Sequence, residues 1–294
     1  MNRSEFLKSL LAGGLLLMTT PLKALHRQFS ALPEREDTMP VLFVGHGSPA
    51  LALKDNPFGQ AWARTAAGLP PPVAVLCISA HWLTRGTFVT AVDQPRTIHD
   101  FGGFSKALYD VHYPAPGHPA LAEEIVSKVQ YTDIHPDHDW GLDHGTWTVL
   151  MKMYPEAQIP VLQMSIDYHQ PPAFHYELAK ELAFLRKRGV LIVASGNIVH
   201  NLRQVDMANE YSSYDWAQAF DETSKALMDA GNHKALVDYA SLGREAQLSI
   251  PTPDHYYPLL YALGLQSNSD TLSYPIDGMT HGSISMRSVL LRDG

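Results

Sequence analysis

The sequence predicts a single α/β domain with a central, mostly parallel or mixed sheet flanked by helices on both faces. From Pro40 onward, short apolar runs alternate with helical stretches, which is typical of a sheet covered by helices. The runs are short and apolar, as strands buried on both faces are. The 294 residues, 45% of them hydrophobic, can also build one large core. These three observations predict the fold class.

Five apolar runs are predicted as strands, at residues 41–44, 73–79, 88–92, 160–166 and 190–194. Helices are predicted at about residues 121–129, 145–153, 173–188 and 216–230. A later helix is predicted to begin near Thr252, where Thr can cap, Pro253 fits the first helical position and Asp254 complements the helix dipole. His255 is then expected in the first turn of that helix.

The first 38 residues differ in kind from the rest. Arg3 and Lys8 precede the apolar run 10–18, as in the basic and apolar regions of an export signal, and residues 3–8 resemble a twin-arginine signal with Ser4 in place of the second arginine. The run is too short for a stable membrane span. We expect export to the periplasm, or a cytoplasmic protein if this segment is an uncleaved extension or if translation starts at Met39.

Composition excludes several classes of partner and site. The formal net charge is −8 and the 22 Lys and Arg are dispersed, so the sequence predicts no nucleic-acid partner and favours a small molecule. Cys77 is the only cysteine, which excludes an internal disulfide and a zinc site built from several thiolates. Any metal site therefore depends on the fifteen histidines.

Histidines follow the ends of three predicted strands, at His46, His81 and His200. Ligands of open α/β sheets bind beyond the carboxyl ends of strands, where these side chains can converge. Imidazole is the commonest protein ligand of first-row metals, so the three, with His255, predict a mononuclear metal site. The alternatives are a structural turn or a phosphate loop around His46, and a buried core histidine at His81.

Seven short motifs resemble the class III extradiol ring-cleavage dioxygenases, in the branch that includes DOPA extradiol dioxygenases. They lie in order at residues 45–49, 79–82, 98–104, 113–117, 143–145, 195–197 with 200–203, and 253–258. The resemblance runs from about residue 40 to residue 292. It implies a catalytic domain at residues 39–294, preceded by the signal-like or extension segment 1–38. It also implies one non-haem metal, a catechol bound through its two oxygens, and O2 beside it.

The resemblance also implies roles for five histidines. His46 and His81 match the two metal histidines of the family, and His255 matches the third metal position, where other class III enzymes have glutamate. Fe2+ is expected as the working metal, because zinc has no redox chemistry, and Zn2+ as another occupant of the same site. His200 matches the acid/base position, with a fourth metal ligand or a structural role as alternatives. His144 matches a second catalytic histidine that contacts dioxygen or substrate, with a structural role at a helix start as the alternative.

Other polar residues near these motifs carry weaker predictions. Asp143 or Asp100 can orient a histidine through a hydrogen bond to its ring, although Asp100 can instead cap a turn. Arg203 and Tyr257 are candidates for contacting a substrate carboxylate or ring. Eight further histidines are predicted on surface loops or helix faces, and His281 is the least certain of them; they are His112, His118, His135, His138, His169, His175, His233 and His281.

The sequence therefore predicts a metal-dependent extradiol dioxygenase that opens the ring of a DOPA-like catechol with O2. One alternative is a zinc hydrolase, in which Asp143 or His144 is the general base for a metal-bound water. The other is a zinc-binding protein without enzymatic activity. The sequence makes no prediction about the oligomeric state.

Overall fold

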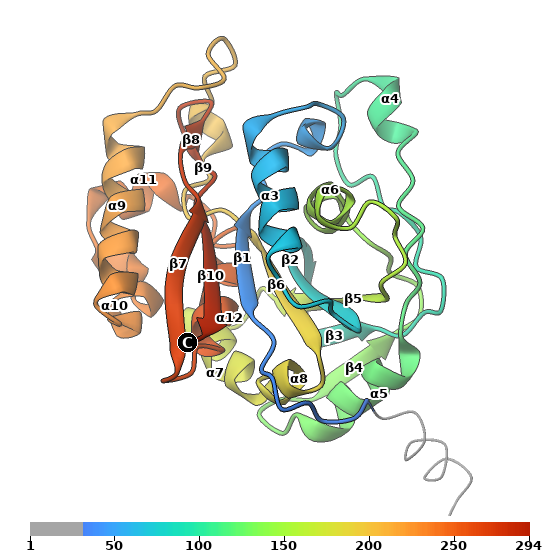
Figure 1. The fold of residues 1–294 in the computed structure, drawn as a ribbon. Helices are drawn as coiled ribbons and strands as arrows, with labels where there is room; N and C mark the ends of the chain where they lie inside the picture. Colours follow the sequence, from blue (N-terminus) through green and yellow to red (C-terminus); the bar gives the residue numbers. More distant parts are fainter. Residues whose placement is uncertain (1–31) are drawn as a thin grey trace, which may run out of the picture. The chain divides into compact units, whose positions relative to one another are not determined.

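An eight-stranded mixed sheet forms the centre of the computed structural model, which describes residues 32–294 (Figure 1). Pro33–Gly294 form one unit. The strands are β1 (Val41–Gly45), β2 (Ala74–Thr84), β3 (Thr87–Thr90), β4 (Ile134–Asp137), β5 (Val161–Asp167), β6 (Val190–Gly196), β7 (Asp270–Ile276) and β10 (Ser288–Asp293). The predicted α/β class, with helices around a mixed sheet, is confirmed. The predicted signal or extension at residues 1–38 lies almost entirely outside the described residues.

The order of the strands places four parallel strands at the centre of the sheet. The order is β4-β3-β5-β2-β6-β1-β10-β7, and β5, β2, β6 and β1 are mutually parallel. Strand β10 pairs antiparallel with both β1 and β7, and β3 pairs antiparallel with β5. The carboxyl ends of the central strands therefore meet at one edge, where α/β proteins bind their ligands.

Helices cover both faces of the sheet (Figure 1). One face carries α3 (Pro57–Ala67) and α6 (His144–Met153), and the other carries α7 (Pro172–Glu181), α8 (Phe184–Lys187) and α12 (Tyr257–Gly264). On the first face, Trp62 and Trp147 are fully buried in one cluster with Leu42 and Val193. Successive residues of a strand point to opposite faces, so each buried strand contributes to both cores.

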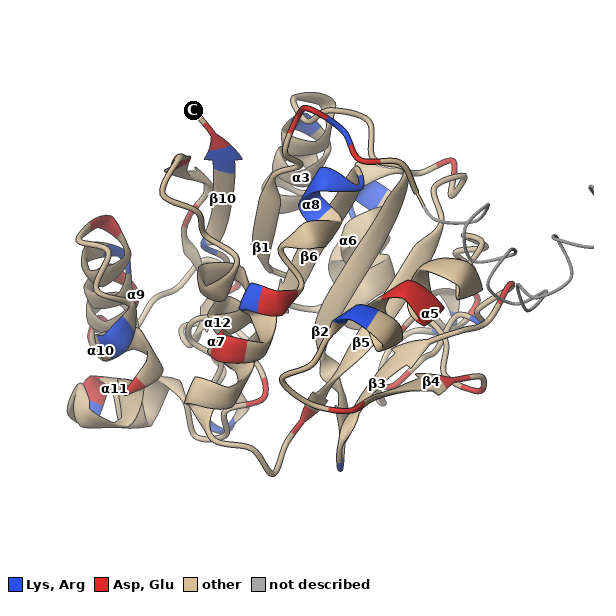
Figure 2. Cartoon of the chain, turned by 90° about the horizontal axis from the view of Figure 1, so that it is seen from below, with Lys and Arg blue, Asp and Glu red and all other residues tan. Residues whose placement is uncertain are grey.

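The remaining elements are short or lie outside these layers. They are α4 (Lys106–Tyr109), α5 (Pro119–Lys128), α9 (Asp215–Asp229), α10 (His233–Val237), α11 (Arg244–Ser249), the 3-10 segments η1 (Pro49–Ala52), η2 (Leu202–Gln204) and η3 (Tyr239–Ser241), and the hairpin of β8 (Met279–Thr280) and β9 (Ile284–Ser285). Arg287 forms a buried ion pair with Asp221 and thereby ties α9 to the chain before β10. Figure 2 shows Lys and Arg interspersed with Asp and Glu on the side of the molecule that it presents.

The five predicted strands are all present, although two details of the prediction are wrong. Strand β2 continues to Thr84, so His81 lies inside it, at the register shift between Ile78 and Leu83, and not after its end. The predicted helix 173–188 is divided into α7 and α8.

The predicted helix start near Thr252 is also wrong. Helix α12 begins at Tyr257, and residues 251–256 form turns. The carbonyl of His255 accepts a hydrogen bond from the amide of Asn197 at the end of β6, which takes it away from the helical bonding pattern. His255 therefore precedes the helix. Within residues 32–294, no helix is long and apolar enough to cross a lipid bilayer.

A buried histidine on α7 makes the stability of the fold depend on pH. Nδ1 of His175 bonds to the Tyr261 hydroxyl at 3.1 Å, and burial lowers the pKa of His175 to about 4. Below about pH 6.5 the unfolded chain binds a proton here that the folded chain does not bind until about pH 4. We expect this histidine to lower the free energy of unfolding by up to about 3 kcal/mol as the pH falls from 7 to 4.

Urea unfolding of the wild type and of a His175→Phe variant at pH 7, 6 and 5 checks this expectation. The phenylalanine ring keeps most of the packing and cannot be protonated, so the stability of the variant relative to the wild type should rise as the pH falls. A stability difference that stays constant over this range would contradict the assignment to His175.

Candidate metal centre

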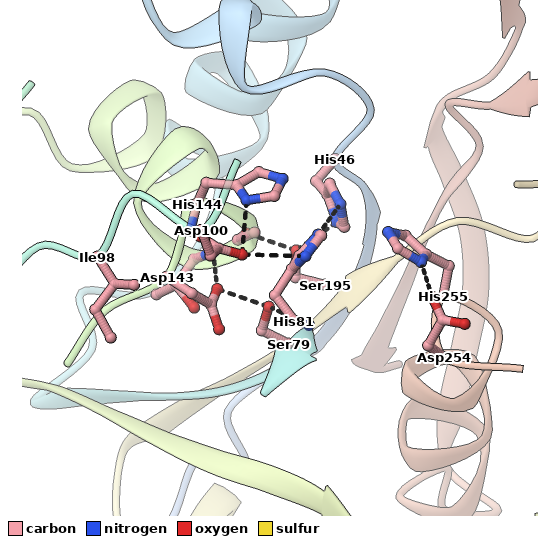
Figure 3. Close-up of polar contacts among 12 residues, drawn as sticks. His46, Ser79, His81, Ile98, Asp100, Asp143, His144, Ser195, Asp254 and His255 are labelled. Carbon is pink, nitrogen blue, oxygen red and sulfur yellow. Dashed lines mark hydrogen bonds and ion pairs between the residues drawn. The ribbon is translucent and has the colours of Figure 1, made fainter. Parts of the chain in front are cut away.

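Two parallel strands bring the first candidate residues together. Strands β1 and β6 end in register, with Gly45 opposite Gly196, and the amide of His46 donates to the Gly196 carbonyl at 3.1 Å. Strand β2 lies on the other side of β6, with Ser79 opposite Ser195. His46 and His81 therefore reach the same edge of the sheet from two strands that flank β6 (Figure 3).

The hydrogen bonds of His46 fix which of its nitrogens carries the proton. Its ring is buried, with Nδ1 at 3.0 Å from the hydroxyl of Ser195. That hydroxyl donates its only hydrogen to the Gly145 carbonyl at 2.6 Å, so it accepts from Nδ1. The Nε2 atom of His46 therefore carries an unshared lone pair.

His81 has the same tautomer for a different reason. Its Nδ1 lies 3.2 Å from a carboxylate oxygen of Asp100, which accepts a hydrogen bond. Its Nε2 lies 3.1 Å from Nε2 of His46, and in the neutral forms of both rings neither atom carries a hydrogen (Figure 3). Two lone pairs at this distance repel each other unless a cation lies between them. This pair of atoms therefore fits a metal ion.

The third histidine of this set is His255. Its carbonyl is held by the Asn197 amide at 2.8 Å, and Gly196 packs so closely that a Cβ there would come within 2.3 Å of the same carbonyl. Its Nδ1 bonds to the carboxylate of Asp254 (Figure 3). Ligand atoms of His46, His81 and His255 all lie within 4.8 Å of one another. Each ring is oriented by a hydrogen bond on its far side, which is typical of metal-binding histidines.

The surroundings of these rings favour their neutral forms. Burial, and then the charges that the neighbouring histidines would carry, hold the pKa values of His46 and His255 well below the usual range. A histidine must be neutral to bind a metal, so both rings are ready to do so at neutral pH.

Asp100 connects two of the histidines through a single carboxylate. Its Oδ2 accepts from Nδ1 of His144 at 2.9 Å as well as from His81, and its Oδ1 accepts from the His144 amide at 2.9 Å. Burial raises the pKa of Asp100, but the bonds and charges of His144 and His81 outweigh burial, and the pKa lies below its usual range. Asp100 therefore keeps both rings protonated on Nδ1, which leaves Nε2 of His144 as an acceptor.

His200 lies beside this group rather than inside it. Its ring stacks on His255, with centroids 3.5 Å apart and planes at 8°, and its amide donates to the Ser249 carbonyl at 2.9 Å. Its ligand atom lies within 4.8 Å of those of Asp254 and His255. Burial lowers the pKa of His200 to about 4. The ring is therefore neutral near pH 7 and able to accept a proton.

Among residues 32–294, no hydrogen bond joins the carboxylate of Asp143 to a histidine ring. It caps α6, and its carboxylate accepts from Ser79 Oγ at 2.7 Å, Gln163 Nε2 at 2.6 Å and the Thr146 amide at 3.1 Å. These bonds occupy a fully buried carboxylate. Of the two aspartates predicted to orient a histidine, Asp100 does so at this site and Asp143 does not.

A cavity of about 400 Å³ opens onto the cluster of histidines. Its lining includes all five candidate histidines and residues from four loops, among them Ser48, Pro49, Phe101, Phe104, Leu202, Val205, Met207, His281 and Ile284. The volume is within the range of small-molecule sites, and most of these walls are apolar. The sequence analysis missed Val205, Met207 and Ile284, because isolated apolar residues in loops have no periodic pattern.

Of three residues with weaker predictions, one lines this cavity and two do not. Arg203 and Tyr257 are not among its lining residues, since Arg203 is exposed on η2 and the Tyr257 ring packs on His175 with centroids 4.2 Å apart. His281 does line the cavity, although its sequence context suggested a surface position.

Residues 41–286 match the family model described as the catalytic LigB subunit of aromatic ring-opening dioxygenase. A protein of Escherichia coli K12 named 4,5-DOPA dioxygenase extradiol is 49% identical over 256 residues, which cover 85% of this chain and 94% of the relative. One of the same name from Beta vulgaris is 36% identical, with 84% and 96% covered. A crystal structure of an uncharacterised protein from Escherichia coli K12 superposes with a TM-score of 0.75 at 43% identity, and covers 86% of this chain and 99% of that protein.

Proposed function

This chain belongs to the family of the catalytic LigB subunit of aromatic ring-opening dioxygenases, and we propose that it opens the ring of a DOPA-like catechol with O2. The reaction class is that of the family, an extradiol dioxygenase. The catechol is our proposal, supported by the names of the relatives and by an apolar cavity of suitable size next to the histidines. We further propose residues 39–294 as the catalytic domain.

We propose that His46, His81 and His255 hold one divalent metal ion, with Fe2+ as the working metal and Zn2+ as an alternative occupant. The observation that carries this proposal is the approach of two Nε2 atoms to 3.1 Å in rings whose Nδ1 atoms both face hydrogen-bond acceptors, Ser195 and Asp100. When bound, the metal would lower the pKa of the catechol hydroxyls and bring O2 next to the ring.

The other two histidines are proposed to act on the substrate and dioxygen. His200 and His144 both line the cavity and have lowered pKa values, chiefly because they are buried. A neutral ring can accept the proton of a catechol hydroxyl and return it as the ring opens. We propose His200 for this acid/base role rather than as a fourth ligand, because its nitrogen lies outside the group formed by the three ligands. His144 is proposed to contact the substrate or dioxygen through Nε2.

Family membership argues against the two alternatives predicted from the sequence, the zinc hydrolase and the zinc-binding protein without activity. The hydrolase also loses one candidate base, since the buried carboxylate of Asp143 is occupied by three hydrogen bonds. The dioxygenase is therefore the function that the site supports best.

Reconstitution with defined metals tests the proposal. Chelator-stripped protein is loaded anaerobically with Fe2+ or Zn2+ and then exposed to oxygenated DOPA and other catechols. We expect O2 uptake and a yellow ring-fission product with iron only, because zinc cannot pass electrons to O2. Protein that contains one iron per chain but consumes no O2 with any catechol would contradict the proposed reaction.

A further inference from the structure

His281 has a backbone conformation that residues other than glycine rarely adopt. Its φ is 51°, in the left-handed region, and it lies in the turn of the β8–β9 hairpin. This region costs a residue with a Cβ roughly 1–2 kcal/mol, so the surrounding contacts must impose it. Strain of this kind at a cavity wall suggests a function for the side chain.

Neighbouring backbone groups hold His281 in place. Its amide donates to the Glu210 carbonyl at 2.9 Å, and its carbonyl accepts from the Asp206 amide at 2.8 Å. Its ring is held as well, with Nδ1 at 3.2 Å from the Asp206 carbonyl. A carbonyl only accepts, so the proton is on Nδ1, and Nε2 of the neutral ring remains an acceptor.

The part of the cavity formed by this segment is apolar and lacks cationic side chains. Val205, Met207 and Ile284 line it together with His281, and none of the lining residues within the described range 32–294 is Lys or Arg. The segment that holds His281 carries Asp206 and Glu210. Glu210 lies 3.8 Å from Lys54, while the carboxylate of Asp206 bonds to its own turn. A carboxylate on a bound molecule would find no ion-pair partner on these walls, whereas a hydrogen-bond donor would find one acceptor.

We propose that His281 determines specificity by accepting a hydrogen bond from the substituent of the catechol. The cavity then favours catechols whose side chain ends in an ammonium group over those whose side chain ends in a carboxylate, with uncharged side chains between them. This inference rests on the proposed function, because it assumes that the catechol ring lies against the cluster of histidines.

Three catechols test the proposal: dopamine, 4-ethylcatechol and 3-(3,4-dihydroxyphenyl)propionate, in which two side-chain carbons next to the ring carry an ammonium group, a hydrogen and a carboxylate. Their dissociation constants are measured by calorimetry on the full-length zinc-loaded protein without oxygen, so that no turnover interferes. We expect dopamine to bind at least about tenfold more tightly than the propionate, since a hydrogen bond to a charged group is worth that much.

A His281→Gly variant removes the ring and also relieves the backbone, because glycine adopts positive φ readily. We expect it to fold, to bind 4-ethylcatechol as the wild type does within about twofold, and to lose most of the preference for dopamine. A His281→Asn variant, which tolerates the same φ and keeps an acceptor, should restore part of that preference. Ala157→Gly is the matched control, because Ala157 also has positive φ (50°) but is not among the residues lining the cavity.

Several results would overturn the proposal. They are equal binding of dopamine and the propionate by the wild type, an equal loss for all three ligands in His281→Gly, a changed preference in Ala157→Gly, and no binding of any catechol. Binding in the expected order without O2 uptake by the iron-loaded protein would refute the proposed reaction and leave the recognition by His281 standing.

Discussion

Replacing His46 with alanine is expected to abolish ring cleavage and to weaken metal binding by two orders of magnitude or more. Structural zinc sites with four ligands bind with about 10–16 kcal/mol, which is roughly 3 kcal/mol for each ligand. His46 offers its Nε2 lone pair toward His81, and its far nitrogen is already committed to Ser195. Competition with a chelator of known affinity measures the metal dissociation constant, and O2 uptake measures activity.

The control for this variant is His135→Ala, which removes an exposed histidine on β4. It should leave metal affinity and activity unchanged. His255→Ala should reproduce the effect of His46→Ala. If one of these two variants does not fold, the other still tests the prediction. Thermal unfolding of the metal-free proteins shows whether each variant is folded. Full metal occupancy and activity in folded His46→Ala protein would exclude His46 as a ligand.

The sequence predicts the central strands well because burial on both faces leaves a simple signal. Strands β1, β2, β5 and β6 appear as continuous apolar runs. Strand β7 was not predicted, because its residues alternate between partial burial and exposure and include Pro275. Strand β10 also was not predicted, although its first four residues are buried.

The candidate histidines were found because they stand in short motifs near strand ends, whereas the directions of their neighbours were not predictable. Asp100 and Asp143 each lie next to a histidine in the sequence, so the sequence predicts equally for both that they orient a histidine ring. Tertiary contacts decide between them, since Asp143 turns inward to Ser79 and Gln163 while Asp100 turns to His81 and His144. Side-chain direction in a loop depends on residues far away in the chain, and no local pattern encodes it.

Replacing Asp100 with asparagine is expected to weaken metal binding by about 10–100-fold and to lower activity further. Three N–H groups bond to this carboxylate, from the ring and amide of His144 and the ring of His81. An asparagine amide has one acceptor oxygen, so at least one of these groups loses its partner. If that group is the His81 ring, the proton can move to Nε2, where it blocks coordination. Activity falls more than affinity because His144 loses its orientation as well.

Asp143→Asn separates orientation of the histidines from stability of the fold. Asp100→Asn and Asp143→Asn each replace a carboxylate with an amide. The hydrogen bonds of Asp143, however, go to Ser79, Thr146 and Gln163 and not to a histidine ring. We expect Asp143→Asn to lower the melting temperature of the metal-free protein with little change in metal affinity. We expect Asp100→Asn to weaken metal binding with little change in that melting temperature. Equal losses of affinity in the two variants would mean that neither carboxylate acts specifically through a histidine, because a general loosening of the site would then account for both.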